Sequence, residues 1–133
     1  MSLLIGEHIQ ECLTTDAKVS AKVGERVYPI VVVGGAPEYP FITYTVEDTH
    51  PGTETKDGVL EDVATVSICS VAKTYGEAVR IAHYARYALE GNAAKYADFE
   101  VLDASMVGSQ QTYESALPAF GVMITVEFNT IDF

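Results

Sequence analysis

The chain offers few side chains whose type and spacing suit metal binding. His8 and Cys12 lie four residues apart in a helical pattern, so both would project from one helix face as two candidate metal ligands. A structural zinc ion takes four ligands, and the sequence holds no second pair of His or Cys at a suitable spacing. Ordinary packing in or on the helix is the favoured interpretation, and we predict no metal site.

A run of carboxylates between positions 47 and 62 is the second group that could bind a cation. Its members are Glu47, Asp48, Glu54, Asp57, Glu61 and Asp62. Carboxylate oxygens suit a divalent cation, but the run lacks the ligand spacing of a calcium-binding loop. A solvated acidic loop is the favoured interpretation, and a loose cation site is the alternative.

Signatures of enzymatic chemistry are missing from the sequence. It holds no Gly-x-Ser-x-Gly motif, and the pair Gly34-Gly35 lacks the third glycine and the following helix of a dinucleotide site. His83 lies between Arg80 and Arg86 in a helical pattern, which indicates a solvated helix face. We therefore predict that the protein is not an enzyme and uses no cofactor.

Net charge is the strongest signal in the composition. Nineteen Asp and Glu oppose eight Lys and Arg, which gives a formal net charge of −11. Nucleic-acid binding draws on clustered cations, so we predict no specific binding to nucleic acid and no binding to an anionic membrane. The acidity fits solubility alone, and it also fits a negative surface that DNA passes without adhering. Composition does not decide between these two.

Length and hydropathy predict one domain, residues 1–133, made in the cytoplasm. The chain is 48% hydrophobic and 20% charged, which is ordinary for a globular protein. No stretch approaches the roughly 20 apolar residues of a membrane-spanning helix. The first residues lack the basic and apolar regions of a secretory signal. Cys12 and Cys69 are therefore expected to be free thiols in a reducing compartment.

Hydrophobic patterns predict an α+β fold with a mostly antiparallel sheet of four to five strands. The strand candidates are 27–33, 41–46, 59–71, 99–107 and 122–128, with 110–115 as a further strand or a loop. Pro29 places the first strand at an edge or breaks it. Alternation puts Phe99, Val101, Asp103, Ser105 and Val107 on one side. Residues 47–58 have no aliphatic side chain and are predicted to form an exposed loop or hairpin tip.

Two helices are predicted to pack on this sheet. One covers 3–13, with a short helical turn after Asp16, and one long helix runs from about Tyr75 to Glu90. Thr74 with Glu77 three residues later is a capping-box pattern. The stripe expected to face the sheet is Tyr75, Ala78, Ala82, Ala85 and Leu89. Tyr84 and Tyr87 lie on the opposite face and are candidate subunit-contact aromatics.

Three sequence blocks in a fixed order resemble the tail completion, or tail-to-head joining, proteins of long-tailed bacteriophages and prophages. The blocks are Arg26-Val27-Tyr28-Pro29, Pro40-Phe41-Ile42-Thr43-Tyr44 and Thr74-Tyr75-Gly76-Glu77-Ala78. The helix end Ala88-Leu89-Glu90-Gly91 is also of the family type. The resemblance covers nearly the whole chain. It departs at Cys69-Ser70-Val71-Ala72, where many relatives carry an aromatic residue, often Trp.

The resemblance implies a virion structural protein with no catalytic residues. Such a protein caps the tail tube and helps join tail to head as a subunit of a homo-oligomeric ring, with six subunits as a candidate size. Its expected partners are copies of itself, the tail tube protein and head-connector proteins. It would be prophage-encoded, assembled in the bacterial cytoplasm and located in the virion tail.

Two other readings stay open at this point. One is a small dimeric α+β binding module of unknown ligand, and the other is a different head–tail connector or minor tail protein. In the ring reading, the six carboxylates of the 47–62 run belong to a subunit-contact or lumen-facing loop.

Overall fold

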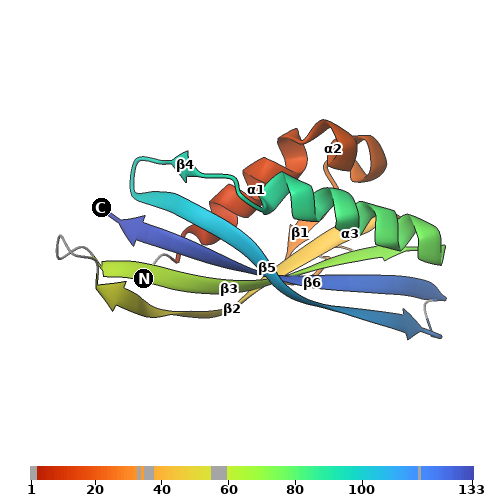
Figure 1. The fold of residues 1–133 in the computed structure, drawn as a ribbon. Helices are drawn as coiled ribbons and strands as arrows, with labels where there is room; N and C mark the ends of the chain where they lie inside the picture. Colours follow the sequence, from red (N-terminus) through yellow and green to blue (C-terminus); the bar gives the residue numbers. More distant parts are fainter. Residues whose placement is uncertain (1–2, 33, 35–37, 55–59, 117) are drawn as a thin grey trace.

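A twisted sheet with helices packed on one face forms the protein (Figure 1). The computed structural model describes residues 3–32, 34, 38–54, 60–116 and 118–133. The strands are β1 (Val27–Pro29), β2 (Phe41–Glu54), β3 (Leu60–Ala72), β4 (Ala94–Lys95), β5 (Phe99–Glu114) and β6 (Ala119–Asp132). The helices are α1 (Ile5–Thr15), α2 (Ala17–Val23) and α3 (Tyr75–Leu89). The α+β class is confirmed.

The sheet is larger than predicted, and its strand order is β1-β2-β3-β6-β5-β4. Every neighbouring pair is antiparallel except β1 and β2, so the mostly antiparallel arrangement is confirmed. The prediction of four to five strands was wrong because it missed β4, which contains only two residues, and the predicted strand 27–33 is shorter, ending at Pro29. Strands that short cannot show an alternating pattern. The prediction of one long helix with an N-terminal helix was also incomplete, since α2 is a separate third helix.

Strand β5 shows why one predicted side assignment was wrong. Phe99 and Val101 are buried on the helix side, but a bulge between Val101 and Asp103 adds a residue to β5. A bulge of this kind reverses the alternation that follows it. Asp103 therefore points to the opposite face, and buried Ala104 takes the next core position. Residues 110–114 continue β5 rather than forming a loop, and β2 likewise continues through Glu54.

The core lies between the helices and one face of the sheet. Its fully buried large side chains include Ile5, Ile9, Leu13, Ile81, Leu89, Phe99 and Phe128. Ala78, Ala82 and Ala85 of α3 are buried as predicted, and their small size allows the helix to approach the sheet closely. Tyr75, at the first turn, is half exposed instead.

Two side-chain hydrogen bonds fix the N-terminal end of α3. The buried Ser70 Oγ donates to the carbonyl of Ala78 at 2.7 Å, which ties β3 to the helix. Thr74 Oγ1 accepts from the backbone N–H of Glu77 at 3.3 Å. This bond is the N-cap half of the predicted capping box. These two contacts fix the start of α3 relative to the sheet, and with it the helix face that points away from the sheet.

Candidate functional site

The sheet face that points away from the helices gathers carboxylates from four strands. Residues directly opposite each other in the register share a side, which places Asp48 of β2 and Glu127 of β6 on either side of Thr65. Asp103 of β5 lies one row nearer the β2–β3 hairpin, opposite Asn129. Glu61 shares this side by alternation along β3. We call Asp48, Glu61, Asp103 and Glu127 the acidic sheet face.

This face is unusual because its four long strands contain no cation. The sequences of β2, β3, β5 and β6 include neither Lys nor Arg. The polar positions between the carboxylates are filled by neutral residues such as Thr65 and Thr125. His50 lies on the same side, and its Nδ1 is 2.8 Å from an Asp48 carboxylate oxygen. The result is an extended and negatively charged surface.

The structure brings together only part of the predicted carboxylate run. Asp48 and Glu61 reach the acidic sheet face, and Glu47 is exposed beside a bulge in β2. Asp62 points to the helix side and is 8% exposed. The Glu54 side chain and residue Asp57 lie outside the described part of the chain.

Sequence reasoning missed two members of the acidic sheet face. Asp103 and Glu127 are far from the 47–62 run in the sequence, and strand pairing brings them to it. The signal that would find them is the alternation of β5 and β6 combined with their register, rather than local charge density.

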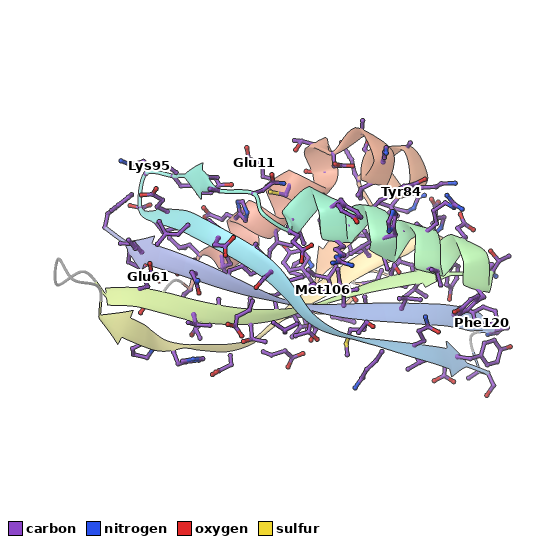
Figure 2. All side chains as sticks on the ribbon, viewed as in Figure 1. Glu11, Glu61, Tyr84, Lys95, Met106 and Phe120 are labelled. Carbon is purple, nitrogen blue, oxygen red and sulfur yellow. The ribbon has the colours of Figure 1, made fainter. Side chains whose placement is uncertain are left out.

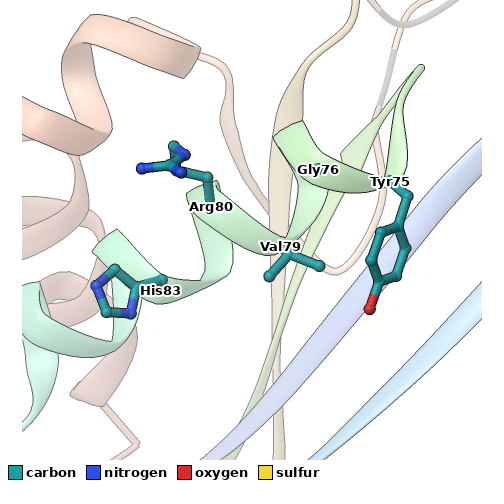
Figure 3. A pocket seen from close by; sticks show the side chains of 5 residues that line it. All are labelled: Tyr75, Gly76, Val79, Arg80 and His83. Atoms are coloured by element: carbon teal, nitrogen blue, oxygen red, sulfur yellow. The ribbon is translucent and has the colours of Figure 1, made fainter.

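The outward side of α3, next to α2, is the second candidate surface. Two adjoining depressions of about 420 and 320 Å³ share His83. The first is lined by Tyr75, Gly76, Val79, Arg80 and His83, shown in Figure 3. The second is lined by Asp16, Ala17, Lys18, His83, Tyr84 and Tyr87. We call the two depressions together the α2–α3 groove.

Both predicted contact aromatics line this groove, which is rich in cations. Lys18 Nζ lies 5.6 Å from the centre of the Tyr84 ring, within the range of a cation–π contact. A hydrogen bond with Arg80 lowers the pKa of the Tyr84 phenol, and the charges of Arg80, Lys18 and Lys22 lower it further. Tyr87 is 62% exposed. The groove is thus a positive, aromatic surface on a strongly acidic protein.

His8 and Cys12 pack against neighbours rather than presenting metal ligands. His8 is 1% exposed, its Nδ1 lies 2.8 Å from the Tyr96 hydroxyl, and its Nε2 lies 3.5 Å from the Cys12 sulfur. Burial lowers the pKa of His8 and raises the pKa of the Cys12 thiol to about 11. Both groups are therefore neutral at pH 7. Within the described ranges, no three His, Cys, Asp or Glu side chains are placed to hold a metal ion together.

One solved structure shares the fold of this chain. Among the described helices, none is long and apolar enough to cross a membrane. A chain of a solved structure titled "Virion of native gene transfer agent (GTA) particle" is similar, with a TM-score of 0.72 at 13% identity. The match covers 94% of this chain and 92% of that one, and at this identity it shows a shared fold. No curated protein matches.

The family comparison covers almost the whole chain. The model described as "Tail completion protein gp17" matches residues 7–130. This range includes all three sequence blocks that carry the resemblance and every helix and strand except the ends of α1 and β6. The chain therefore belongs to the tail completion protein gp17 family.

Proposed function

We propose that the protein is a ring subunit that caps the phage tail tube and helps join the tail to the head. Family membership supports a structural role in phage tails. The likeness to a chain of a gene transfer agent virion supports a location in the virion tail. In this proposal the protein is prophage-encoded, assembles with copies of itself and contacts the tail tube and head-connector proteins.

The observation that carries the proposal is the acidic sheet face. DNA that moves through a ring must not adhere to the wall, and Lys or Arg would hold it by releasing counterions from its phosphates. The four long strands supply carboxylates and neutral polar groups but no cation. In our proposal the part of this face around Asp103 and Glu127 lines the lumen.

The same subunit has no catalytic role in this proposal. A nucleophilic cysteine needs a lowered thiol pKa. Burial instead raises the pKa of both Cys12 and Cys69, so both thiols stay protonated at neutral pH. The three histidines are also unsuited to act on a substrate together, since His8 is buried, His50 lies on the sheet face and His83 lies in the α2–α3 groove. Structure and assembly therefore account for the protein better than chemistry does.

A small dimeric binding module is the second candidate, and the edge of β5 favours it. On its outer side, β5 pairs with β4 only at Glu100 and Val101, and the part of the chain described here provides no strand partner beyond Val101. Such an edge can pair with its own copy across a two-fold axis. A dimer that shows no affinity for tail tubes would support this reading.

The test is to add the purified protein to tail tubes assembled from the tube protein of the same phage. We expect electron microscopy to show a ring at one end of each tube, and tube growth to stop there. Tubes incubated without the protein are the control. A stable dimer that leaves both tube ends bare would overturn the proposal in favour of the binding module.

A further inference from the structure

We propose that the α2–α3 groove receives the acidic β2–β3 hairpin of a second copy of this chain. This inference rests on the proposed function and names the contact that would close the ring. We define the acidic hairpin by the described residues Glu47, Asp48 and Glu61. Repeated from subunit to subunit, the contact is heterologous, and contacts of that kind generate rings when the rotation closes.

The groove is built to receive negative charge. Lys18 and Arg80 line the groove, the charge of Lys22 also acts on Tyr84, and none of the three has a carboxylate partner in the described part of the chain. Asp16 also lines the groove, but its carboxylate accepts hydrogen bonds from the N–H groups of Lys18 and Val19 at 3.0 Å as the cap of α2. The Asp16 carboxylate is therefore already engaged in capping α2.

The groove also offers contact area beside its charges. The rings of Tyr84 and Tyr87 line one depression, and Val79 lines the other. The His83 ring meets the Tyr87 ring edge-on, with centroids 4.9 Å apart. Aromatic side chains and Arg, such as Tyr84, Tyr87 and Arg80 here, are enriched in protein contacts. A polar strand pair that carries carboxylates can form ion pairs with the cations of the groove and pack against its aromatic rings.

The acidic hairpin has the matching charge and an exposed position. Glu47 and Asp48 are exposed, and Glu61 is half-buried on the neighbouring strand. With a net charge of −11, two copies repel each other unless the contact joins opposite charges. The chain has only eight Lys and Arg, and Lys18, Lys22 and Arg80 are three of them. Charge complementarity therefore favours a second copy as the occupant.

The positions of hairpin and groove require the contact to be between molecules. Figure 1 shows the β2–β3 end of the sheet at the opposite end of the molecule from α2 and the start of α3. Glu61 and Tyr84 mark the two ends in Figure 2. A subunit cannot fill its own groove with its own hairpin. Each copy gives its hairpin to one neighbour and receives a hairpin from the other.

Charge reversal on each surface, alone and combined, tests this contact. The groove variant carries Lys18→Glu and Arg80→Glu, the hairpin variant carries Asp48→Lys and Glu61→Lys, and the swapped variant carries all four. Mass photometry in low salt measures the protein concentration at which rings form. We expect each two-site variant to need at least tenfold more protein than the wild type to form rings. The swapped variant should recover rings, and so should a mixture of the two variants. Lys95→Glu, on β4, is the matched control and should assemble normally.

The outcomes separate this inference from the proposed function. Two outcomes would overturn the hairpin contact while leaving the proposed ring function standing. In the first, both two-site variants form rings as the wild type does. In the second, the swapped variant forms no rings although circular dichroism shows that it is folded. A wild-type protein that never forms rings, with or without tail tubes, would overturn both proposals. Duplex DNA bound by the wild type and released by the groove variant would make phosphate the occupant instead of a second copy.

Discussion

Turning the acidic sheet face into a cationic one should make the protein bind DNA. The change replaces Asp48, Glu61, Asp103 and Glu127 with Lys. Asp48 and Glu127 lie one strand to either side of Thr65, so they are about 10 Å apart across the sheet. Four ammonium groups at such spacings can meet several phosphates of one duplex. Each replacement changes the charge by two units, so four of them take the formal net charge from −11 to −3.

The size of the effect follows from counterion release. If four Lys contact phosphates, the logarithm of the binding constant falls with the logarithm of salt at a slope of about −3.6. Affinity then drops about 150-fold between roughly 50 and roughly 200 mM salt. The wild-type face has no cation on its four long strands, so we expect no measurable binding even at low salt, where electrostatic attraction is strongest.

Fluorescence anisotropy with a labelled duplex measures both affinity and salt slope. The matched control reverses four exposed carboxylates elsewhere, Glu7, Glu25, Glu38 and Asp98, and reaches the same net charge. We expect the control to bind more weakly than the sheet-face variant because its cations are scattered. Tight binding by the unmodified protein at low salt would refute the reasoning about a repulsive wall. Equal binding by both variants would show that net charge, not the face, decides.

The other predictions concern stability and assembly. Burial lowers the pKa of His8 from 6.5, so the unfolded chain binds the proton more readily, and stability should fall as the pH drops below about 6.5, by at most about 1.4 kcal/mol per pH unit. Urea unfolding of His8→Gln should lack that part of the pH slope, whereas His83→Gln should keep it. Thr74→Ala should cost about 1 kcal/mol in urea unfolding because α3 loses its cap, and Thr74→Asp should restore most of it. Tyr87→Ala should weaken self-association in sedimentation without lowering the melting temperature, since the ring is largely exposed. Hydrogen exchange at residues 47–54, which pair with β3 on one side only, should slow further in assembled tails, and exchange that does not change on assembly would argue against a contact there.

The sequence predicts elements well where one face is buried. The apolar residues of β6 alternate without interruption, and all of them face the protein core: Val122, Ile124, Val126 and Phe128. In α3 the alanine stripe marks the buried side because a helix returns to the same face every three to four residues. A periodic signal of this kind is a direct consequence of burial. It survives in a single sequence because each position is under the same physical constraint.

The remaining features depend on contacts that a local pattern does not record. The bulge before Asp103 shifts β5 by one residue, and nothing in the neighbouring sequence marks it. The acidic sheet face joins residues from four strands, so its charge appears only once the register is known. The 47–62 run was only a partial guide because alternation sends Asp62 to the helix side. The sequence predicted two residues of the α2–α3 groove, Tyr84 and Tyr87. It did not show that Lys18 of α2 lies beside them, because that neighbour comes from a separate helix.

The polarity of the sheet face limits where neighbouring subunits can bind. A sheet with one face free of helices either meets a partner through apolar residues or faces water through polar ones. Burying Asp103 and Glu127 in a contact would strip water from carboxylates that have no cation on the same strands, at a cost of several kcal/mol each. The part of the face around Asp103 and Glu127 therefore stays exposed to water in the ring, and the helix side, the β2–β3 end and the sheet edges are left for neighbours. Glu127→Gln removes one charge without changing shape, so it should leave ring formation unchanged in mass photometry. Loss of rings in that variant would show that the sheet face is itself a subunit contact.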